Sequence, residues 1–330
     1  MKKTSPVSLA VLCALAIGSA SAALHAQTAE TSDAGASASD DIFKTEPKRY
    51  RLGTARVFTN DLIDGRQDRW RTGSVTTSRA YGFGWDGAAP SRFGELLELR
   101  IQGQIITPED LGKFDPDDRP WAGALSFGLH SHSTFHGAEI AVGADIVVIG
   151  PQTHLDDFQE RLHELISAPT PSEDVLANQI EDTIRPTFVA EIGKQYQLGV
   201  TSVLRPFAEF RAGDETLGRI GADFTYGLAG RGELLARENV TGQRYRVVRS
   251  DHPTGLSFSF GGDVAYVSDS VFLPESRGYE LTDTRNRLRA GLSWESDGAT
   301  IFTGVTYLDR EFEGQREGQY TGTFRVRLSF

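Results

Sequence analysis

Four short clusters of polar residues in the first half of the chain combine side chains that are suited to hydrolytic chemistry. Asparagine and aspartate offer hard oxygen atoms, which are the ligands that Ca²⁺ prefers. A histidine can take a proton from water near neutral pH, and lysine or glutamine can donate hydrogen bonds to an oxyanion. In chain order the clusters are Asn60-Asp61, residues 68–73 with Thr72, residues 107–123 with Lys113, and the pair Gln159 and His163.

The last cluster lies in the one stretch of the mature chain with a clear helical pattern, which predicts a helix over residues 153–167. The preceding Gly150-Pro151 ends a strand. Gln159 and His163 stand four residues apart and therefore share one side of the helix. We expect the apolar side to pack against the protein while this pair points elsewhere. The apolar side carries Leu155, Phe158, Leu162 and Leu165.

The rest of the mature chain repeats runs that alternate apolar and polar residues and end in turns, and residues 93–106 show the pattern best. Charged groups at every second position suit a barrel with an apolar outer wall and a wet lumen. We therefore predict an all-β, twelve-stranded antiparallel transmembrane β-barrel. The twelve runs are 49–58, 70–84, 93–106, 120–132, 137–149, 185–197, 202–213, 217–230, 255–271, 285–296, 299–312 and 320–330.

Both ends of the chain support export to the bacterial outer membrane. Residues 1–26 have the basic start, the short apolar run and the small residues of a secretory signal peptide, which is cleaved. Residues 27–45 predict a flexible periplasmic leader, and residues 46–330 the barrel. The last strand ends on Phe330, as strands recognised by the outer-membrane assembly machinery do. The only cysteine, Cys13, leaves with the signal, so thiol chemistry is excluded.

The net charge of −11 argues against nucleic acid as a partner and is compatible with a divalent cation. With the chain entering strand 1 from the periplasm, all four polar clusters fall at the extracellular end of neighbouring strands, where they can converge. One connection does not fit this topology, because residues 231–254 form a long segment on the periplasmic side. Either a periplasmic excursion exists there, or one strand is misplaced.

In this order and spacing, the clusters resemble the motifs of the outer-membrane lipid A deacylases. The matching motifs are ND at 60–61, DRWRTG at 68–73, TP and DRPWAG within 107–123, and GP with QxxxH within 150–163. The resemblance implies a Ca²⁺-dependent esterase that removes the 3′-linked acyloxyacyl group from lipid A in the outer leaflet. It also implies a site made of Asn60, Asp61, Thr72, Lys113, Gln159 and His163, with His163 as the general base.

Two positions depart from the family pattern. Arg71 stands directly before the threonine, where the family has an aromatic residue, and residues 169–173 offer no clear counterpart to an acidic residue expected after the helix. Our hypothesis places the ester carbonyl on Ca²⁺ held by Asn60 and Asp61, with His163 activating water. Either Gln159 or Lys113 donates to the oxyanion, and the other meets a lipid A phosphate. We expect a monomer whose partners are lipopolysaccharide and outer-membrane lipids.

Two alternatives remain at this point. A non-catalytic barrel, either a pore or a lipopolysaccharide binder, predicts an open lumen and no bound cation. A phospholipase with a Ser-His-Asn site would need a His-x-Ser-Asn-Gly signature, and residues 130–133, which read HSHS, are not followed by Asn-Gly, so the sequence disfavours this alternative. We expect His130, His132 and His136 to be lumen or girdle residues rather than a metal site. The tryptophans near strand ends suit aromatic girdles, namely Trp70, Trp85, Trp121 and Trp294.

Overall fold

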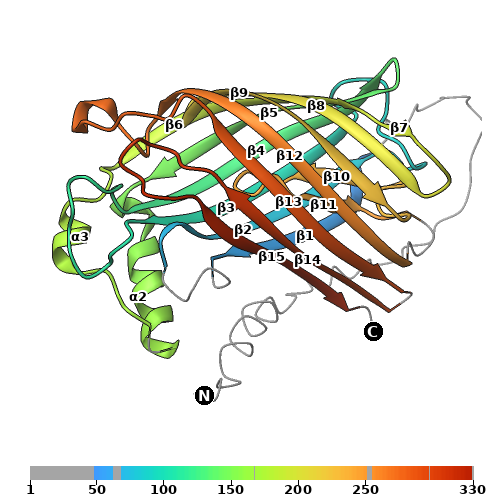
Figure 1. The fold of residues 1–330 in the computed structure, drawn as a ribbon. Coiled ribbons are helices and arrows are strands. Elements are labelled where there is room, and N and C mark those ends of the chain that lie inside the picture. The colour runs from blue at the N-terminus through green and yellow to red at the C-terminus, as the bar shows by residue number, and fades with distance from the viewer. Residues whose placement is uncertain (1–47, 62–67, 167, 251–254, 297, 329–330) are drawn as a thin grey trace, which may run out of the picture.

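Twelve long antiparallel strands form a closed barrel in the computed structural model, which describes residues 48–61, 68–166, 168–250, 255–296 and 298–328 (Figure 1). Each strand pairs with its neighbours in chain order. The last strand returns to the first, with Phe58–Asn60 beside Gly322–Phe324. The strands are β1 (Tyr50–Asn60), β2 (Trp70–Gly82), β3 (Leu96–Thr107), β4 (Ala122–Phe135), β5 (Ala138–Ile149), β6 (Thr183–Lys194), β8 (Ser202–Ala212), β9 (Glu215–Tyr226), β12 (Gly255–Ser270), β13 (Arg285–Glu295), β14 (Ala299–Leu308) and β15 (Gln319–Leu328), and a short β7 (Tyr196–Gln197) extends the sheet beside β8.

The prediction of a twelve-stranded barrel is confirmed, with strand ends that differ by a few residues. On β3 the fully buried Glu98 points into the lumen, whereas Leu99 is 46% exposed on the outer wall. Arg56 and Arg79 interrupt the apolar outer wall on β1 and β2. No helix among the described residues is long and apolar enough to cross a membrane. The predicted signal peptide, the leader up to residue 45 and Phe330 lie outside the described residues.

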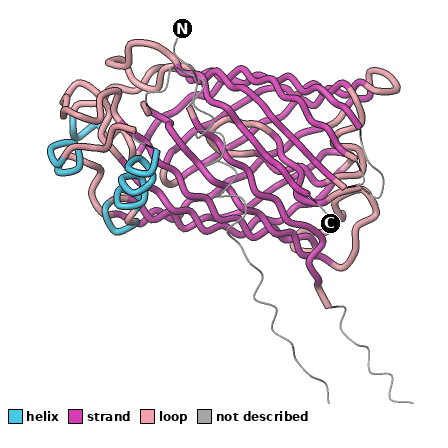
Figure 2. Tube along the Cα trace, turned by 90° about the horizontal axis from the view of Figure 1, so that it is seen from below, coloured by secondary structure: helices cyan, strands magenta, loops and turns pink. Residues whose placement is uncertain are grey.

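The helices gather at one end of the barrel, together with several of the long connections between strands (Figure 2). The predicted helix is present as η1 (Pro151–Thr153) followed by α2 (Leu155–Ile166). The prediction of a single helix was incomplete, because α3 (Glu173–Ala177) follows it, and a short η2 (Glu275–Arg277) lies in a later connection. α3 begins after Ser172, whose Oγ accepts a hydrogen bond from the Val175 amide at 3.3 Å. Five residues are too few to reveal a helical period in the sequence.

The packing predicted for α2 was wrong. Gln159 and His163 are the buried residues of the helix, with 2% and 4% of their surface exposed, whereas Phe158 and Leu165 are 46% and 76% exposed. Among the described side chains of α2, only Leu155 joins an apolar cluster beneath the helix. The helix therefore follows the rule of the barrel wall, where polar side chains face inward and apolar side chains face outward.

A two-stranded hairpin lies inside the barrel and accounts for the connection 231–254. It consists of β10 (Leu234–Arg237) and β11 (Arg244–Val248), of which β11 lies against the inner side of β1 and β2. Val247 packs with Ala55 and Val57 of β1 in one buried apolar cluster. At Gly53 a Cβ atom would stand 2.0 Å from the carbonyl oxygen of Val247, so only glycine fits this approach. The segment is neither a periplasmic excursion nor a misplaced barrel strand.

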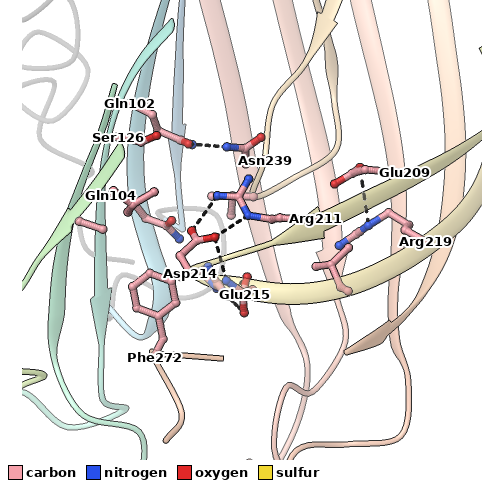
Figure 3. A pocket seen from close by; sticks show the side chains of 15 residues that line it. Gln102, Gln104, Ser126, Glu209, Arg211, Asp214, Glu215, Arg219, Asn239 and Phe272 are labelled. Carbon is pink, nitrogen blue, oxygen red and sulfur yellow. Dashed lines mark hydrogen bonds and ion pairs between the residues drawn. The ribbon is translucent and has the colours of Figure 1, made fainter. Parts of the chain in front are cut away.

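Polar contacts join the hairpin to the surrounding wall. The Tyr245 hydroxyl lies 2.8 Å from Ser78 Oγ, and Asn239 Nδ2 donates to Gln102 Oε1 at 2.8 Å. A polar cavity remains beside the turn of the hairpin. It is lined by Asn239 of this turn and by the ion pair of Arg211 and Asp214 (Figure 3). The hairpin thus occupies the lumen that a pore would need open.

We expect the intact protein to carry no measurable ion current in a planar lipid bilayer. Replacing residues 234–248 with a short Gly-Ser linker removes the side chains that fill the lumen, so this variant should conduct. Single-channel recording tests both statements. A conducting parent, or a folded deletion variant without current, would contradict the assignment of the hairpin as a plug.

Candidate active site

Asn60, Asp61 and Thr72 meet where β1 ends and β2 begins. Asp61 is buried, and its carboxylate accepts hydrogen bonds from the Thr72 hydroxyl at 3.0 Å and from the Arg69 amide at 2.9 Å. The Asn60 side-chain amide donates to the Thr72 carbonyl at 3.1 Å. Trp70, in the left-handed region with φ 54°, begins an irregular stretch of the β2–β3 ladder. This irregularity buries both Arg71 and Thr72.

The surroundings of Asp61 suit a cation. Burial raises the pKa of Asp61 to about 8, and the negative charge of Asp68 adds to the shift, while the hydrogen bonds from Arg69 and Thr72 oppose it. Among the described residues, no group of three or more His, Cys, Asp or Glu side chains is arranged to hold a metal ion. Ca²⁺ takes six to eight oxygen ligands. Asp61 and Asn60 fit as two of them, and backbone carbonyls, water and substrate would have to supply the others.

His163 is fixed through both nitrogens of its ring. Nδ1 lies 2.5 Å from the carbonyl oxygen of Pro169, which can only accept, so Nδ1 carries a proton. Nε2 lies 2.7 Å from Oδ2 of Asp68. Burial lowers the pKa of His163, but the contacts with Asp68 and Pro169 and the charges of Asp68 and Asp61 outweigh it, so the net pKa is raised. Nε2 is therefore the nitrogen that can exchange a proton within the site.

Gln159 links this histidine to the barrel rim. Its Nε2 donates to the same Oδ2 of Asp68 at 3.2 Å, and its Oε1 accepts from Trp121 Nε1 at 2.8 Å. Both ends of the amide are thus engaged. Asp68 stands just before β2, and Trp121 stands just before β4, so α2 is linked to the starts of two strands that flank β3.

Lys113 has a different position from the other five predicted site residues. It is exposed in the connection between β3 and β4. Leu111 of the same connection packs with Trp121 and Val175, which holds the connection against the helices. Lys113 takes no part in the hydrogen bonds described above, so the structure brings together Asn60, Asp61, Thr72, Gln159 and His163 and does not bring Lys113 into their contacts.

Asp68 and Trp121 were not predicted as site residues from the sequence, although both lie within the polar clusters. The assignment of Trp121 and Trp70 to aromatic girdles was wrong, since their exposed fractions are 0% and 1%. Trp294 does face outward. The sequence carries no signal for the pairing of Asp68 with His163, because the two residues meet only when α2 lies across the barrel rim.

His130, His132 and His136 lie outside the contacts of this site. His130 and His132 are buried on the lumen side of β4, where they contact Asp145 at 2.8 Å and Glu98 at 2.7 Å. His136 is exposed in the turn between β4 and β5. The prediction of lumen or girdle positions is thus confirmed for His130 and His132, which face the lumen, whereas His136 lies in a turn.

Comparison with known proteins finds one matching family model and several similar solved structures. A family model described as "Outer membrane protein LpxR" matches residues 9–330. LpxR from Salmonella typhimurium has a similar structure, with a TM-score of 0.67, 17% sequence identity, and coverage of 84% of this chain and 100% of that chain. The β domain of the Bordetella autotransporter BrkA matches with a TM-score of 0.40 and 13% identity, over 85% of this chain and 99% of that chain. No curated protein matches the sequence.

Proposed function

The chain belongs to the LpxR family of outer-membrane proteins, and from this premise we propose that it is a Ca²⁺-dependent lipid A 3′-O-deacylase. The observation that carries the proposal is the contact of His163 with Asp68 at 2.7 Å, beside the buried Asp61 and Thr72. A histidine with a fixed tautomer, a carboxylate partner and a neighbouring oxygen-rich site is an arrangement suited to ester hydrolysis. The substrate would be lipopolysaccharide in the outer leaflet.

Asn60 and Asp61 would hold the cation, which supplies a Lewis acid for the ester carbonyl when it is bound. The hydrogen bond from Thr72 fixes the Asp61 carboxylate. His163 acts as the general base through Nε2, because Nδ1 donates to Pro169. For this role Nε2 must be unprotonated and must exchange its contact with Asp68 for one with water. Asp68 then stabilises the imidazolium that forms.

Gln159 and Lys113 remain the two candidates for oxyanion and phosphate contacts. The Gln159 amide donates to Asp68 and accepts from Trp121. One hydrogen of its NH2 group is thus engaged by Asp68, and only the second hydrogen is left to donate to an oxyanion. Lys113 is exposed and carries a long side chain, which suits a lipid A phosphate better than a buried oxyanion. We accordingly assign the phosphate contact to Lys113.

The direct test is mass spectrometry of lipid A from cells that express the chain, and of purified lipid A treated with the detergent-solubilised protein. We expect loss of the 3′-linked acyloxyacyl group in Ca²⁺ and no loss after chelation. A passive lipopolysaccharide-binding barrel would leave lipid A intact under both conditions. Release of the acyl group that does not respond to chelators would refute the Ca²⁺ dependence while leaving the deacylase assignment standing.

The pH dependence should report on His163 and Asp68. A general base works when it is deprotonated, so activity should rise with pH through the raised pKa of His163, above its ordinary value of 6.5. Asp68→Asn removes a charge and a hydrogen bond that raise this pKa, so the acidic limb should move to lower pH and the maximal rate should fall. Profiles of kcat/KM between about pH 5 and 9 measure the shift. Glu164→Gln, at an exposed position of α2, serves as the control.

A further inference from the structure

Glu311 joins two arginines at the helix end of the barrel. It lies in the connection between β14 and β15, and its side chain is 12% exposed. Its Oε1 accepts from Arg71 Nε at 2.8 Å, and its Oε2 accepts from Arg119 Nη1 at 2.5 Å. One carboxylate thus holds β2 to the connection between β3 and β4.

Each arginine leads to a different half of the candidate site. Arg71 directly precedes Thr72, whose hydroxyl donates to Asp61. Arg119 stands two residues before Trp121, which donates to the Gln159 amide beside His163. The half with Asp61 and the half with His163 therefore meet through Glu311, although Glu311 itself is hydrogen-bonded to neither.

The surroundings keep Glu311 and its arginines in place. The Arg71 amide donates to Gln319 Oε1 at 2.9 Å, and the Glu311 amide donates to Gln315 Oε1 at 2.9 Å. Arg119 is 1% exposed. Charge-assisted contacts of this kind are short and directional, so they fix the separation of the segments that carry them.

We propose that Glu311 is a positioning residue that sets the separation between the Asp61–Thr72 half and the Gln159–His163 half of the site. The inference rests on the proposed function of that site. It also gives a physical role to Arg71, which stands where the family pattern has an aromatic residue. Here the buried guanidinium reaches inward to Glu311 and also to Glu215 at 3.1 Å.

The test compares Glu311→Gln with Asp214→Asn. Glutamine offers one acceptor oxygen, so only one of the two arginines keeps its hydrogen bond to residue 311, while Arg71 also retains Glu215. Asp214 is a matched control, because it is buried at the same end of the barrel and pairs through both oxygens with Arg211, at 2.7 Å each (Figure 3). Glu311→Gln should lower kcat about 10-fold with KM and the pH profile little changed, because small misplacements of reacting groups are costly. Asp214→Asn should lower thermal stability and leave kcat unchanged.

Two further variants make the result decisive. Arg119→Met should lower kcat by a similar factor, and its combination with Glu311→Gln should add little, because both changes break one link. Glu311→Asp keeps the charge but is shorter, so it should fold and show an intermediate kcat. The proposal would be overturned by any of three results. These are a near-parental kcat in Glu311→Gln, equal losses of kcat in Glu311→Gln and Asp214→Asn, and additive losses of kcat in the double variant.

Hydrogen exchange separates failure of this inference from failure of the proposed function. Glu311→Gln should speed amide exchange in residues 155–163 and around Trp121, whereas Asp214→Asn should not. A parent protein that never deacylates lipid A would refute the proposed function, and the exchange experiment would still test the link. Unchanged exchange in folded Glu311→Gln protein would refute the positioning role by itself.

Discussion

Replacing His163 with asparagine is expected to slow acyl release from lipid A at least about 10²-fold while the barrel stays folded. Asparagine retains a polar side chain of similar reach, but it cannot accept the proton that Nε2 would take from water. The loss should appear mainly in kcat, because the side chain acts on the reacting water rather than on substrate binding. Binding of Ca²⁺ should persist, since the Asp61 carboxylate is held by Thr72 and Arg69 instead.

A neighbouring histidine provides the control for this prediction. His154 precedes α2, its side chain is 78% exposed, and it pairs with the exposed Asp157 at 3.3 Å. His154→Asn should therefore deacylate at the parental rate. Both variants should show the heat-dependent gel mobility of a folded barrel. If His163→Asn also retains near-parental activity, the base lies elsewhere, and Asp68 is the next residue to test because its carboxylate faces the same space.

The barrel strands were predictable because their pattern is local. The alternation of polar and apolar residues, as at Glu98 and Leu99, indicates which side of the barrel wall each side chain faces. This pattern can be read without knowing which distant segments the strand contacts. The lumen hairpin has the same kind of alternation, with Tyr245 and Val247 on one side. Its place inside the barrel depends on packing against Ala55 and Val57, far away in the sequence. A local pattern cannot show that contact.

The predicted orientation of α2 was wrong for a related reason. Helical spacing identifies an apolar side but does not say what that side meets. In a water-soluble protein the apolar side packs inward, whereas this barrel presents apolar residues outward along its wall. Phe158 and Leu165 follow the wall, and the buried side of the helix is the polar one with Gln159 and His163.

The candidate site was predictable as a set of residue types and not as a network. Asn60, Asp61 and Thr72 meet because neighbouring strands bring them together, which topology already implied. The contacts made by Asp68, Trp121 and Glu311 join segments that are far apart in the sequence. These segments come together only in the folded protein, at the end of the barrel. Each of these three is an ordinary loop or strand-end residue in the sequence, so no spacing rule marks it.

Replacing Asp61 with alanine is expected to reduce activity to the level that the parent shows after chelation, and to abolish stabilisation by Ca²⁺. A ligand that binds only the folded state stabilises it by about 2.7 kcal/mol at a concentration one hundredfold above its Kd. Thermal unfolding in detergent, with and without Ca²⁺, should show this increase in stability for the parent and no increase for Asp61→Ala. Asp117→Ala, at an exposed position between β3 and β4, should keep both the activity and the gain.

The unfolding temperatures of parent and Asp61→Ala in the presence of chelator distinguish a metal-binding role of Asp61 from a structural role. Burial, together with the charge of Asp68, disfavours the charged form of this carboxyl group, so its replacement removes an unfavourably buried group while it costs two hydrogen bonds. Asp61→Ala should therefore unfold close to the parental temperature without Ca²⁺, and fall below the parent only when Ca²⁺ is present. If the variant is equally destabilised in both conditions, Asp61 supports the rim of the barrel and the cation binds elsewhere. A variant that Ca²⁺ stabilises as much as the parent would lead to the same conclusion about the cation.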